Sequence, residues 1–304
     1  MENLQPSTAK QFKSLWKLGG LTLWQLVRNV FDEIGANHSL GRASELAFDF
    51  LFALFPLILL MVTLFGLFTS RSVELQNHFL SYFGGLLPPA AFQLLRATAT
   101  ELAANASGGK LTFDIVFALW FASGGLNSMI SALNLAYRIR EARSWFKVRT
   151  IALGLTIIIS ILLFTAMFFV LVSSHFVDWL GTELRLRPMV VPIWKSIQWP
   201  VVILFVTMSY SVIYYFGPDL KARQWHWITP GSTFGAFLWL LASVGFRTYL
   251  HFFNTFSASY GSLGAVMLLL AWLYVTGLAF LIGGEINAEI ERAATGGPSE
   301  QTLQ

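Results

Sequence analysis

The chain has 304 residues, of which 55% are hydrophobic and only 12% are charged, with a formal net charge of +4. A soluble domain carries roughly 25% charged residues, so this composition excludes an ordinary water-exposed globular fold and favours a bilayer protein. The chain has no cysteine and its five histidines show no metal-binding spacing, so we expect neither a metal site nor a cofactor.

The first 45 residues (1–45) are predicted to form a cytoplasmic segment with one amphipathic helix. Apolar residues recur there at roughly helical spacing, and charged residues fall between them: Leu15, Leu18, Trp24, Val27, Phe31 and Ile34 alternate with Lys17, Arg28 and Asp32. Such a pattern is typical of a helix that lies in the interface of a bilayer. A soluble cap helix is the alternative. No cleavable signal peptide is recognisable.

Six apolar runs follow, each close to the ~20 residues that a helix needs to cross the hydrocarbon core. They span 46–69, 115–137, 151–172, 193–216, 228–250 and 263–282, within a transmembrane domain of 46–290. Alternating barrel-type strands are absent, so helices must satisfy the backbone hydrogen bonds. We therefore predict an all-α, polytopic transmembrane bundle of about six helices.

Two segments outside these runs have their own patterns. In the loop of 70–110, Phe92, Leu95, Ala99 and Leu102 recur at helical spacing, which predicts short external helices packed over the bundle. The Gly-, Pro- and Ser-containing segment 291–304 is predicted to be a disordered cytoplasmic tail.

Lysine and arginine are distributed unevenly between the two sides of the predicted bundle. Five lie in the N-terminal segment before the first run, five in 138–149 and two in 221–223, all on one side if the helices alternate in direction. The positive-inside rule then places both termini in the cytoplasm.

The first predicted helix opens with two acidic residues, Glu45 and Asp49, which lie four apart and so share a face. They are either N-terminal acids favoured by the helix dipole or a cytoplasmic gate that binds protons. Pro56 is expected to kink the same helix.

The second predicted helix carries a polar stripe, because Asn127, Ser131, Asn134 and Arg138 are spaced by four, three and four residues. Gly124 and Gly125 come just before it and allow close backbone approach. The stripe provides either hydrogen bonds between helices or one wall of a polar substrate path.

The last predicted helix places Glu285 and Glu289 on one face near its cytoplasmic end. A carboxylate in an apolar helix requires a proton or a cation, and we expect Arg138 to pair with Glu285. The pair is either structural or a coupling and gating group.

Small residues and prolines mark candidate sites of helix packing or hinging. Besides Pro56, Gly124 and Gly125, these are Pro230, Gly231, Gly235, Gly261 and Gly264, and close packing of helices is their commonest role.

An ordered set of motifs covers most of residues 40 to 292. The motifs are Arg42–Phe48 with Phe55-Pro56, Gly124–Leu126 with Asn134–Tyr137, Tyr214–Asp219, Trp227–Gly231, Tyr260–Val266 and Gly284–Glu289. In this set the chain resembles the YihY/BrkB family of bacterial inner-membrane proteins, formerly labelled ribonuclease BN. At Phe48-Asp49-Phe50 the chain departs from the small or hydroxyl residue and Tyr-Tyr pair of the family. The resemblance implies a six-helix inner-membrane protein and specifies no substrate.

Three hypotheses of function follow from these patterns. The first is a transporter or exporter of a small polar or amphiphilic solute, with Glu45, Asp49, the polar stripe and the late glutamates lining its path. The alternative is a non-transporting membrane factor that binds lipid or organises envelope proteins. A membrane-embedded enzyme is a third reading, but we expect neither enzymatic activity nor nucleic-acid binding, since no catalytic cluster or basic-aromatic surface is recognisable. A solvated pocket between the first, second and sixth helices would favour transport, and a dry bundle the alternative.

Overall fold

The computed structural model describes residues 16–68, 108–183, 187–220, 228–252 and 255–294, and within these ranges the chain is helical with short connections. After a short 3-10 turn, η1 (Leu18–Gly20), the helices are α2 (Leu23–Ala36), α3 (Ser39–Phe68), α6 (Gly108–Ala136), α7 (Trp145–Glu183), α8 (Arg187–Phe216), α9 (Pro230–Phe252) and α10 (Thr255–Ala294). This confirms the predicted all-α class.

Each predicted apolar run lies largely within one helix of α3 to α10, and most of the helices extend beyond the run. Four stretches in the described part of the chain are long and apolar enough to cross a membrane: Val116–Ala136, Trp145–Ala166, Ser196–Phe216 and Val266–Ala294. The number of six spans therefore stays a prediction. The external helices predicted in 70–110 fall almost entirely outside the described residues, and α10 continues through Ala294, beyond the predicted tail boundary.

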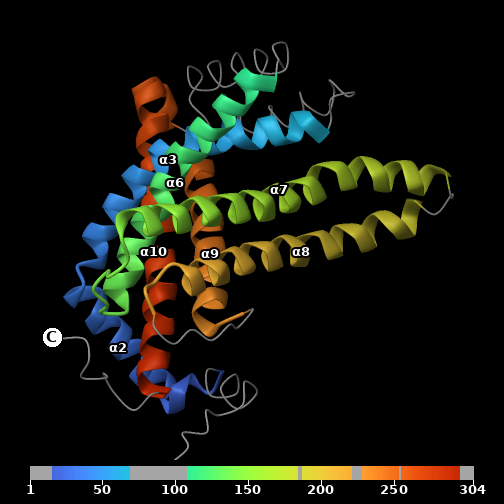
Figure 1. Ribbon diagram of the computed structural model, residues 1–304. Coiled ribbons are helices and arrows are strands. Elements are labelled where there is room, and N and C mark those ends of the chain that lie inside the picture. Colours follow the sequence, from blue (N-terminus) through green and yellow to red (C-terminus); the bar gives the residue numbers. More distant parts are fainter. Residues whose placement is uncertain (1–15, 69–107, 184–186, 221–227, 253–254, 295–304) are drawn as a thin grey trace, which may run out of the picture.

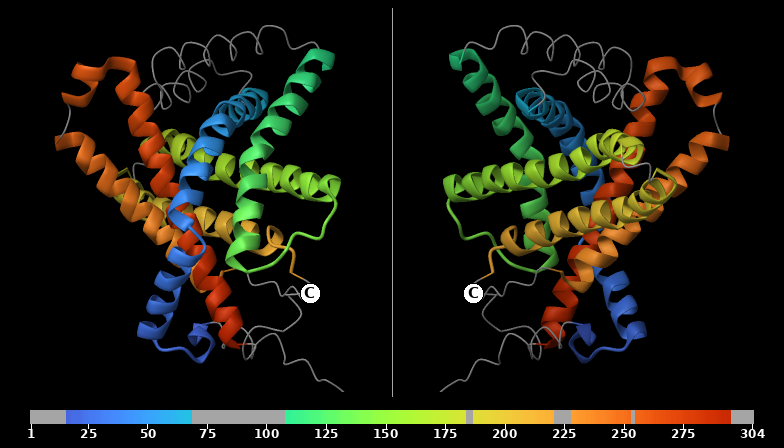
Figure 2. Two further views of the ribbon diagram at one scale, coloured as in Figure 1. Left: turned by 90° about the vertical axis from the view of Figure 1, so that its left-hand side faces the viewer. Right: turned by 90° about the vertical axis from the view of Figure 1, so that its right-hand side faces the viewer.

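Helix α10 is the centre of the arrangement and contacts α2, α3, α6 and α9. Helices α3 and α6 form an antiparallel pair beside it, whereas α7 and α8 form a long antiparallel hairpin that lies crosswise to α10 and extends away from it (Figure 1). The two side views agree on this crosswise placement (Figure 2). Figure 1 also shows that α3 bends, as expected for a helix with an internal proline, Pro56.

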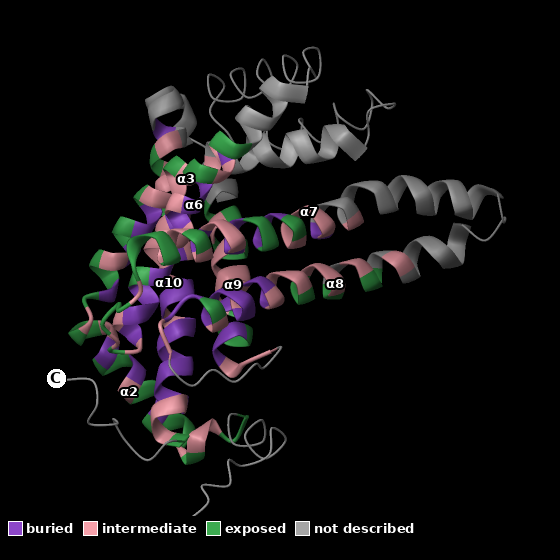
Figure 3. Cartoon of the chain, viewed as in Figure 1, coloured by how far each residue is buried: buried purple, intermediate pink, exposed green. Residues whose placement is uncertain are grey.

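Burial is concentrated at the end of the bundle where α2 lies, here called the α2 end (Figure 3). In α10 every residue from Ala279 to Ile290 except Ile282 is buried, whereas Leu273 and Gly277 are the buried ones between Val266 and Leu278. In α6 burial likewise rises toward Ala136. Among the residues whose burial is described, the bundle is thus most closely packed at the α2 end.

The core of the α2 end joins four helices through large apolar side chains. Leu46 of α3, Leu133 of α6, Tyr214 of α8 and Phe280 of α10 belong to one buried cluster. Tyr214 also donates a hydrogen bond of 2.6 Å to the Phe280 carbonyl, which fixes α8 against α10.

Glycine permits the closest helix approach, between α9 and α10. A Cβ on Gly231 would lie 2.2 Å from the Gly283 carbonyl oxygen, so the two backbones touch and a side chain cannot fit. Pro230 is the first residue of α9, where its missing N–H costs nothing. Among the other predicted packing residues, Gly125 faces Ala53 and Gly235 faces Tyr210, whereas Gly124 faces open space. Gly261 and Gly264 both lie within α10, and Gly264 is buried.

Candidate functional site

Helix α2 has two apolar faces rather than one. Leu26 and Val30 pack against Ile286 and Ile290 of α10, and Thr22 begins the helix with a capping box. On the other side the large apolar residues are exposed: Leu23, Trp24, Val27 and Phe31. The predicted amphipathic helix is therefore present and is docked on α10. Its position on the membrane surface stays a prediction.

The buried face of α2 also carries the polar residues of a carboxylate cluster, formed with α10 and the end of α6. Its three carboxylates are Glu33, Glu285 and Glu289, and their partners are Asn29, Asn37, Arg138 and Arg292. Asn37 bridges two of the carboxylates, because its Nδ2 donates to Glu285 Oε1 at 2.8 Å and to Glu33 Oε2 at 3.2 Å. The cluster thereby fastens α2 to α10.

Glu285 is the most buried member, with 2% of its surface exposed. Its Oε1 accepts the hydrogen bond of Asn37, and its Oε2 is buried without a hydrogen-bond partner. Glu289 is better supplied, since it accepts from Asn29 Nδ2 at 3.2 Å and forms an ion pair with Arg292. An ionised buried carboxylate with a single donor is costly, so Glu285 is the strained position of the cluster.

The predicted pairing of Arg138 with Glu285 is wrong. Helix α6 ends at Ala136, and Arg138 follows in the left-handed region with a φ of 54°. Its side chain therefore leaves the polar stripe of the helix and forms an ion pair with Glu33 of α2. A four-residue spacing predicts a shared face only while the helix continues.

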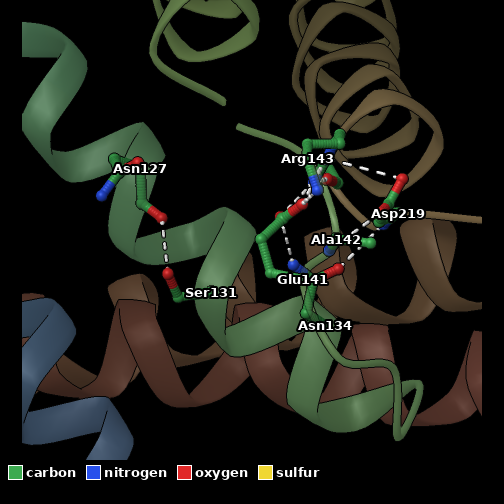
Figure 4. Close-up of polar contacts among 8 residues, drawn as sticks. Asn127, Ser131, Asn134, Glu141, Ala142, Arg143 and Asp219 are labelled. Carbon is green, nitrogen blue, oxygen red and sulfur yellow. Dashed lines mark hydrogen bonds and ion pairs between the residues drawn. The ribbon is translucent and has the colours of Figure 1, made fainter. Parts of the chain in front are cut away.

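A second set of polar contacts, here called the loop network, joins the α6–α7 and α8–α9 connections (Figure 4). It consists of Asn134, Glu141, Arg143 and Asp219. The Nδ2 of Asn134 donates to Glu141 Oε2 at 2.7 Å, and its Oδ1 accepts from the Asp219 backbone N–H at 2.8 Å. Asn134 thus belongs to a structural contact between two connections.

Arg143 is the centre of the loop network, and its side chain is only 3% exposed. Its Nε and Nη2 donate to the two carboxylate oxygens of Glu141 at 2.7 and 2.6 Å, and Nη2 also donates to the Gly217 carbonyl at 2.8 Å. Asp219 Oδ1 lies 3.6 Å from Nε. The hydrogen bonds from Arg143 lower the pKa of Glu141, and Glu141 in turn raises the pKa of Arg143.

The remaining predicted residues lie elsewhere. Asp49 of α3 accepts a hydrogen bond from Ser128 of α6, and Glu45 pairs with Arg42 at 2.8 Å on the exposed surface. Because α3 begins at Ser39, neither acid lies in the first turn, and the dipole explanation is lost.

Ser131 is exposed and donates to the Asn127 carbonyl at 3.2 Å, a bond within α6. Figure 4 shows both residues apart from the loop network. The structure therefore divides the predicted path among several places and brings only Glu285, Glu289 and Arg138 into one cluster.

Sequence reasoning missed the contributions of α2 and of the connections. Asn29, Glu33 and Asn37 are spaced by four residues, so they form one polar stripe beside Leu26 and Val30, and this spacing was visible in the sequence. Glu141 and Arg143, by contrast, lie in an irregular connection whose path has no periodic signal.

Among the described residues no group of three or more His, Asp or Glu is placed to hold a metal ion.

Comparison with known proteins finds a match to the family model described as Virulence factor BrkB over residues 30–303. The chain is 30% identical over 272 residues to the ribonuclease-like protein YfkH of Bacillus subtilis (strain 168), covering 88% of this chain and 95% of that protein. It is 29% identical over 290 residues to a UPF0761 membrane protein of Coxiella burnetii (strain Dugway 5J108-111), covering 90% and 94% of the two chains. A UPF0761 membrane protein of Photobacterium profundum is 27% identical over 263 residues, with 82% and 75% covered. No solved structure matches the chain.

Proposed function

This chain belongs to the Virulence factor BrkB family of membrane proteins, and we propose that it moves a small polar or amphiphilic solute across the bacterial inner membrane. The observation that carries the proposal is the close packing of the described helices at the α2 end. A transporter holds one end of its path closed while the other is accessible, and the two exchange roles during the cycle. Burial in α10 between Ala279 and Ile290 matches the closed end of such a state.

The closed end in this proposal is the cytoplasmic one. The lysine and arginine distribution predicts that the α2 end faces the cytoplasm. There the apolar cluster of Leu46, Leu133 and Phe280 closes the space between α3, α6 and α10, and α2 is fastened beneath it by the carboxylate cluster. Opening this end requires α10 to separate from α3 and α2.

Within this proposal Glu285 is the coupling group. It is buried, and Oε2 lacks a hydrogen-bond partner, so a proton or a small cation at this oxygen would relieve an unfavourable charge. Binding there changes the charge facing Asn37, which joins Glu285 to α2. Charge at one residue is thus linked to the docking of a whole helix.

The chain has no cysteine, which permits a direct test of the moving end. A Cβ on Gly277 of α10 would lie 3.2 Å from the Leu46 Cβ of α3, close to the separation that a disulfide spans. In proteoliposomes, oxidation of the double variant Leu46→Cys/Gly277→Cys should abolish solute flux and reduction should restore it. Each single variant under the same oxidant is the control.

Flux that persists after complete cross-linking would contradict the proposal, because α3 and α10 would then not need to separate. A panel of labelled zwitterionic, anionic and cationic solutes, assayed with and without a proton gradient, identifies the substrate class. Absence of flux for the whole panel from folded, lipid-reconstituted protein would favour the second candidate.

The second candidate is a non-transporting factor that binds lipid or organises envelope proteins. Two observations favour it: the exposed apolar face of α2, and the close contact of α3, α6 and α10 through Gly125, Gly277 and Gly284. Copurification with one protein partner or one lipid class would support it. We assign no nuclease activity to this chain, and cleavage of RNA by the purified protein would contradict that.

A further inference from the structure

The start of α7 and the middle of α6 together form an exposed aromatic surface. Trp120 of α6 and Trp145 of α7 lie with ring centroids 6.3 Å apart, and Phe146 packs edge-on against Trp145 at 5.0 Å. The exposed fractions of Trp145 and Phe146 are 62% and 76%. Indole rings that are exposed in this way at the start of a membrane-crossing stretch are typical of the headgroup region of a bilayer.

A guanidinium lies within this aromatic surface. The Arg149 Cζ lies 4.2 Å from the centroid of the Trp120 ring, and its Nη2 donates to the Trp120 carbonyl oxygen. Arg149 is one helical turn after Trp145, so the two side chains share a face of α7. The cation is therefore held in place by α6 and borders two indoles.

No carboxylate pairs with Arg149 in the part of the chain that the structure describes, and its Nε is buried without a hydrogen-bond partner. The nearest acid in sequence, Glu141, is engaged by Arg143. Lys147, in the first turn of α7, is exposed, but it is two residues from both Trp145 and Arg149 and therefore lies on another side of the helix. The surface carries positive charge and lacks an anion of its own.

We propose that this surface, formed by Trp120, Trp145 and Arg149, binds the phosphate headgroup of an anionic phospholipid. A guanidinium suits a phosphodiester, and the indole rings of Trp120 and Trp145 border the guanidinium, Trp145 at the start of a membrane-crossing stretch. The acyl chains continue over the exposed rings of Phe117 and Phe121 on α6, whose centroids lie 4.5 Å apart. Binding of this lipid does not depend on whether the protein transports a solute.

Lipid retention measured by native mass spectrometry tests the site. The purified full-length protein is exchanged into detergent with equal amounts of phosphatidylglycerol and phosphatidylcholine of identical acyl chains. Wild type should retain more phosphatidylglycerol. Arg149→Gln should lower that preference roughly fivefold, the change expected when one basic group near an anionic headgroup is lost. Lys147→Gln should lower it less, and Arg28→Gln, an exposed arginine on α2, should leave it unchanged.

Equal retention of both lipids by wild type would overturn the proposal, as would an equal loss of preference in Arg149→Gln and Arg28→Gln. Quenching by brominated lipids gives a second measurement should Arg149→Gln fail to fold. Brominated phosphatidylglycerol should quench tryptophan fluorescence more than brominated phosphatidylcholine, and Trp145→Phe should reduce the difference, because Trp120 stays in the site. Equal quenching of wild type by the two lipids would also overturn it.

Discussion

The loop network and the carboxylate cluster are built in opposite ways. The loop network buries a cation, Arg143, and surrounds it with a bidentate carboxylate and a backbone carbonyl. The carboxylate cluster buries an anion, Glu285, supplies it with a single amide donor, and keeps a cation, Arg138, at its edge with 56% of its side chain exposed.

This difference separates a fixed structural contact from a group that can change its charge. An arginine stays charged at any physiological pH, so the loop network has one electrostatic state and fixes the connections it joins. A glutamate can bind a proton and become neutral. A glutamate with an unpartnered oxygen loses little interaction energy when it does so. Arg143 Nη1 is also buried without a hydrogen-bond partner, but an arginine keeps its charge. The region whose central group can change its charge is therefore the one that can respond to protons or cations.

The largest expected effect is in the loop network. Arg143→Met leaves Glu141, Asp219 and the Gly217 carbonyl without their shared donor. Because the Glu141 and Asp219 side chains are 30% and 22% exposed, the loss of these charged hydrogen bonds costs about 1.5–3 kcal/mol. We expect a large fall in the unfolding temperature in mild detergent, or aggregation. Arg140→Met, an exposed arginine of the same connection, is the control and should behave like wild type. Equal stability of both variants would show that the loop network does not hold the α6–α7 and α8–α9 connections together.

The next effect concerns the helix crossing at the α2 end. A Cβ on Gly283 would lie 2.4 Å from the Tyr214 hydroxyl and 2.6 Å from the Gly231 carbonyl oxygen. Gly283→Ala should therefore cost about 1–3 kcal/mol through overpacking. Gly154→Ala on α7, where the added methyl meets nothing within 4 Å, should leave thermal stability unchanged or slightly raised. A tolerated Gly283→Ala would mean that this end is not rigidly packed.

A pair of glutamine substitutions compares the two networks directly. Glu141→Gln replaces a charge-assisted acceptor of Arg143 and, since Glu141 is partly exposed, should destabilise by about 1 kcal/mol. Glu285→Gln removes a buried charge whose Oε2 has no hydrogen-bond partner and keeps the shape of the side chain. Its effect on the free energy of unfolding should be neutral or stabilising. Parallel denaturation of the two variants and wild type measures both changes in the free energy of unfolding. If Glu285→Gln destabilised as much as Glu141→Gln, the proposed contrast would be lost.

The smallest effect is a pH dependence from the loop network. Arg143 lowers the pKa of Glu141 from its ordinary value of 4.5. The stabilisation is therefore complete above that ordinary value and is lost as the pH falls through the lower pKa of the folded state. Between about pH 5 and pH 3, the unfolding temperature of wild type should fall toward that of Glu141→Gln, so that the difference between them narrows. A difference that stayed constant across this range would exclude the Glu141 contribution.

The sequence predicted the helices well because their signal is local. A run of about 20 apolar residues has few alternatives to a helix, whatever surrounds it. The boundaries were less predictable: α3 starts at Ser39, so that Arg42 and Glu45 already form a helical ion pair, although the apolar run begins later.

The candidate site was predictable only in part, because its partners come from distant segments. Glu285 and Glu289 stood out as charges in an apolar helix, and both are indeed buried. Their neighbours depend on how α2 docks, which no short-range pattern specifies. Arg138 shows the limit of periodicity, since a turn with positive φ directs its side chain away from the predicted stripe.

The contact of α2 with α10 has a consequence for biosynthesis. Asn29 and Glu289, which join the two helices, are 260 residues apart in the chain. At ribosomal rates of about 5–20 residues per second, α2 emerges on the order of 10–50 s before its partner exists. During that interval the side chains of α2 that contact α10 lack their hydrogen-bond partners, so the nascent segment must be covered by lipid or by the insertion machinery. Truncation of α10 should leave α2 undocked.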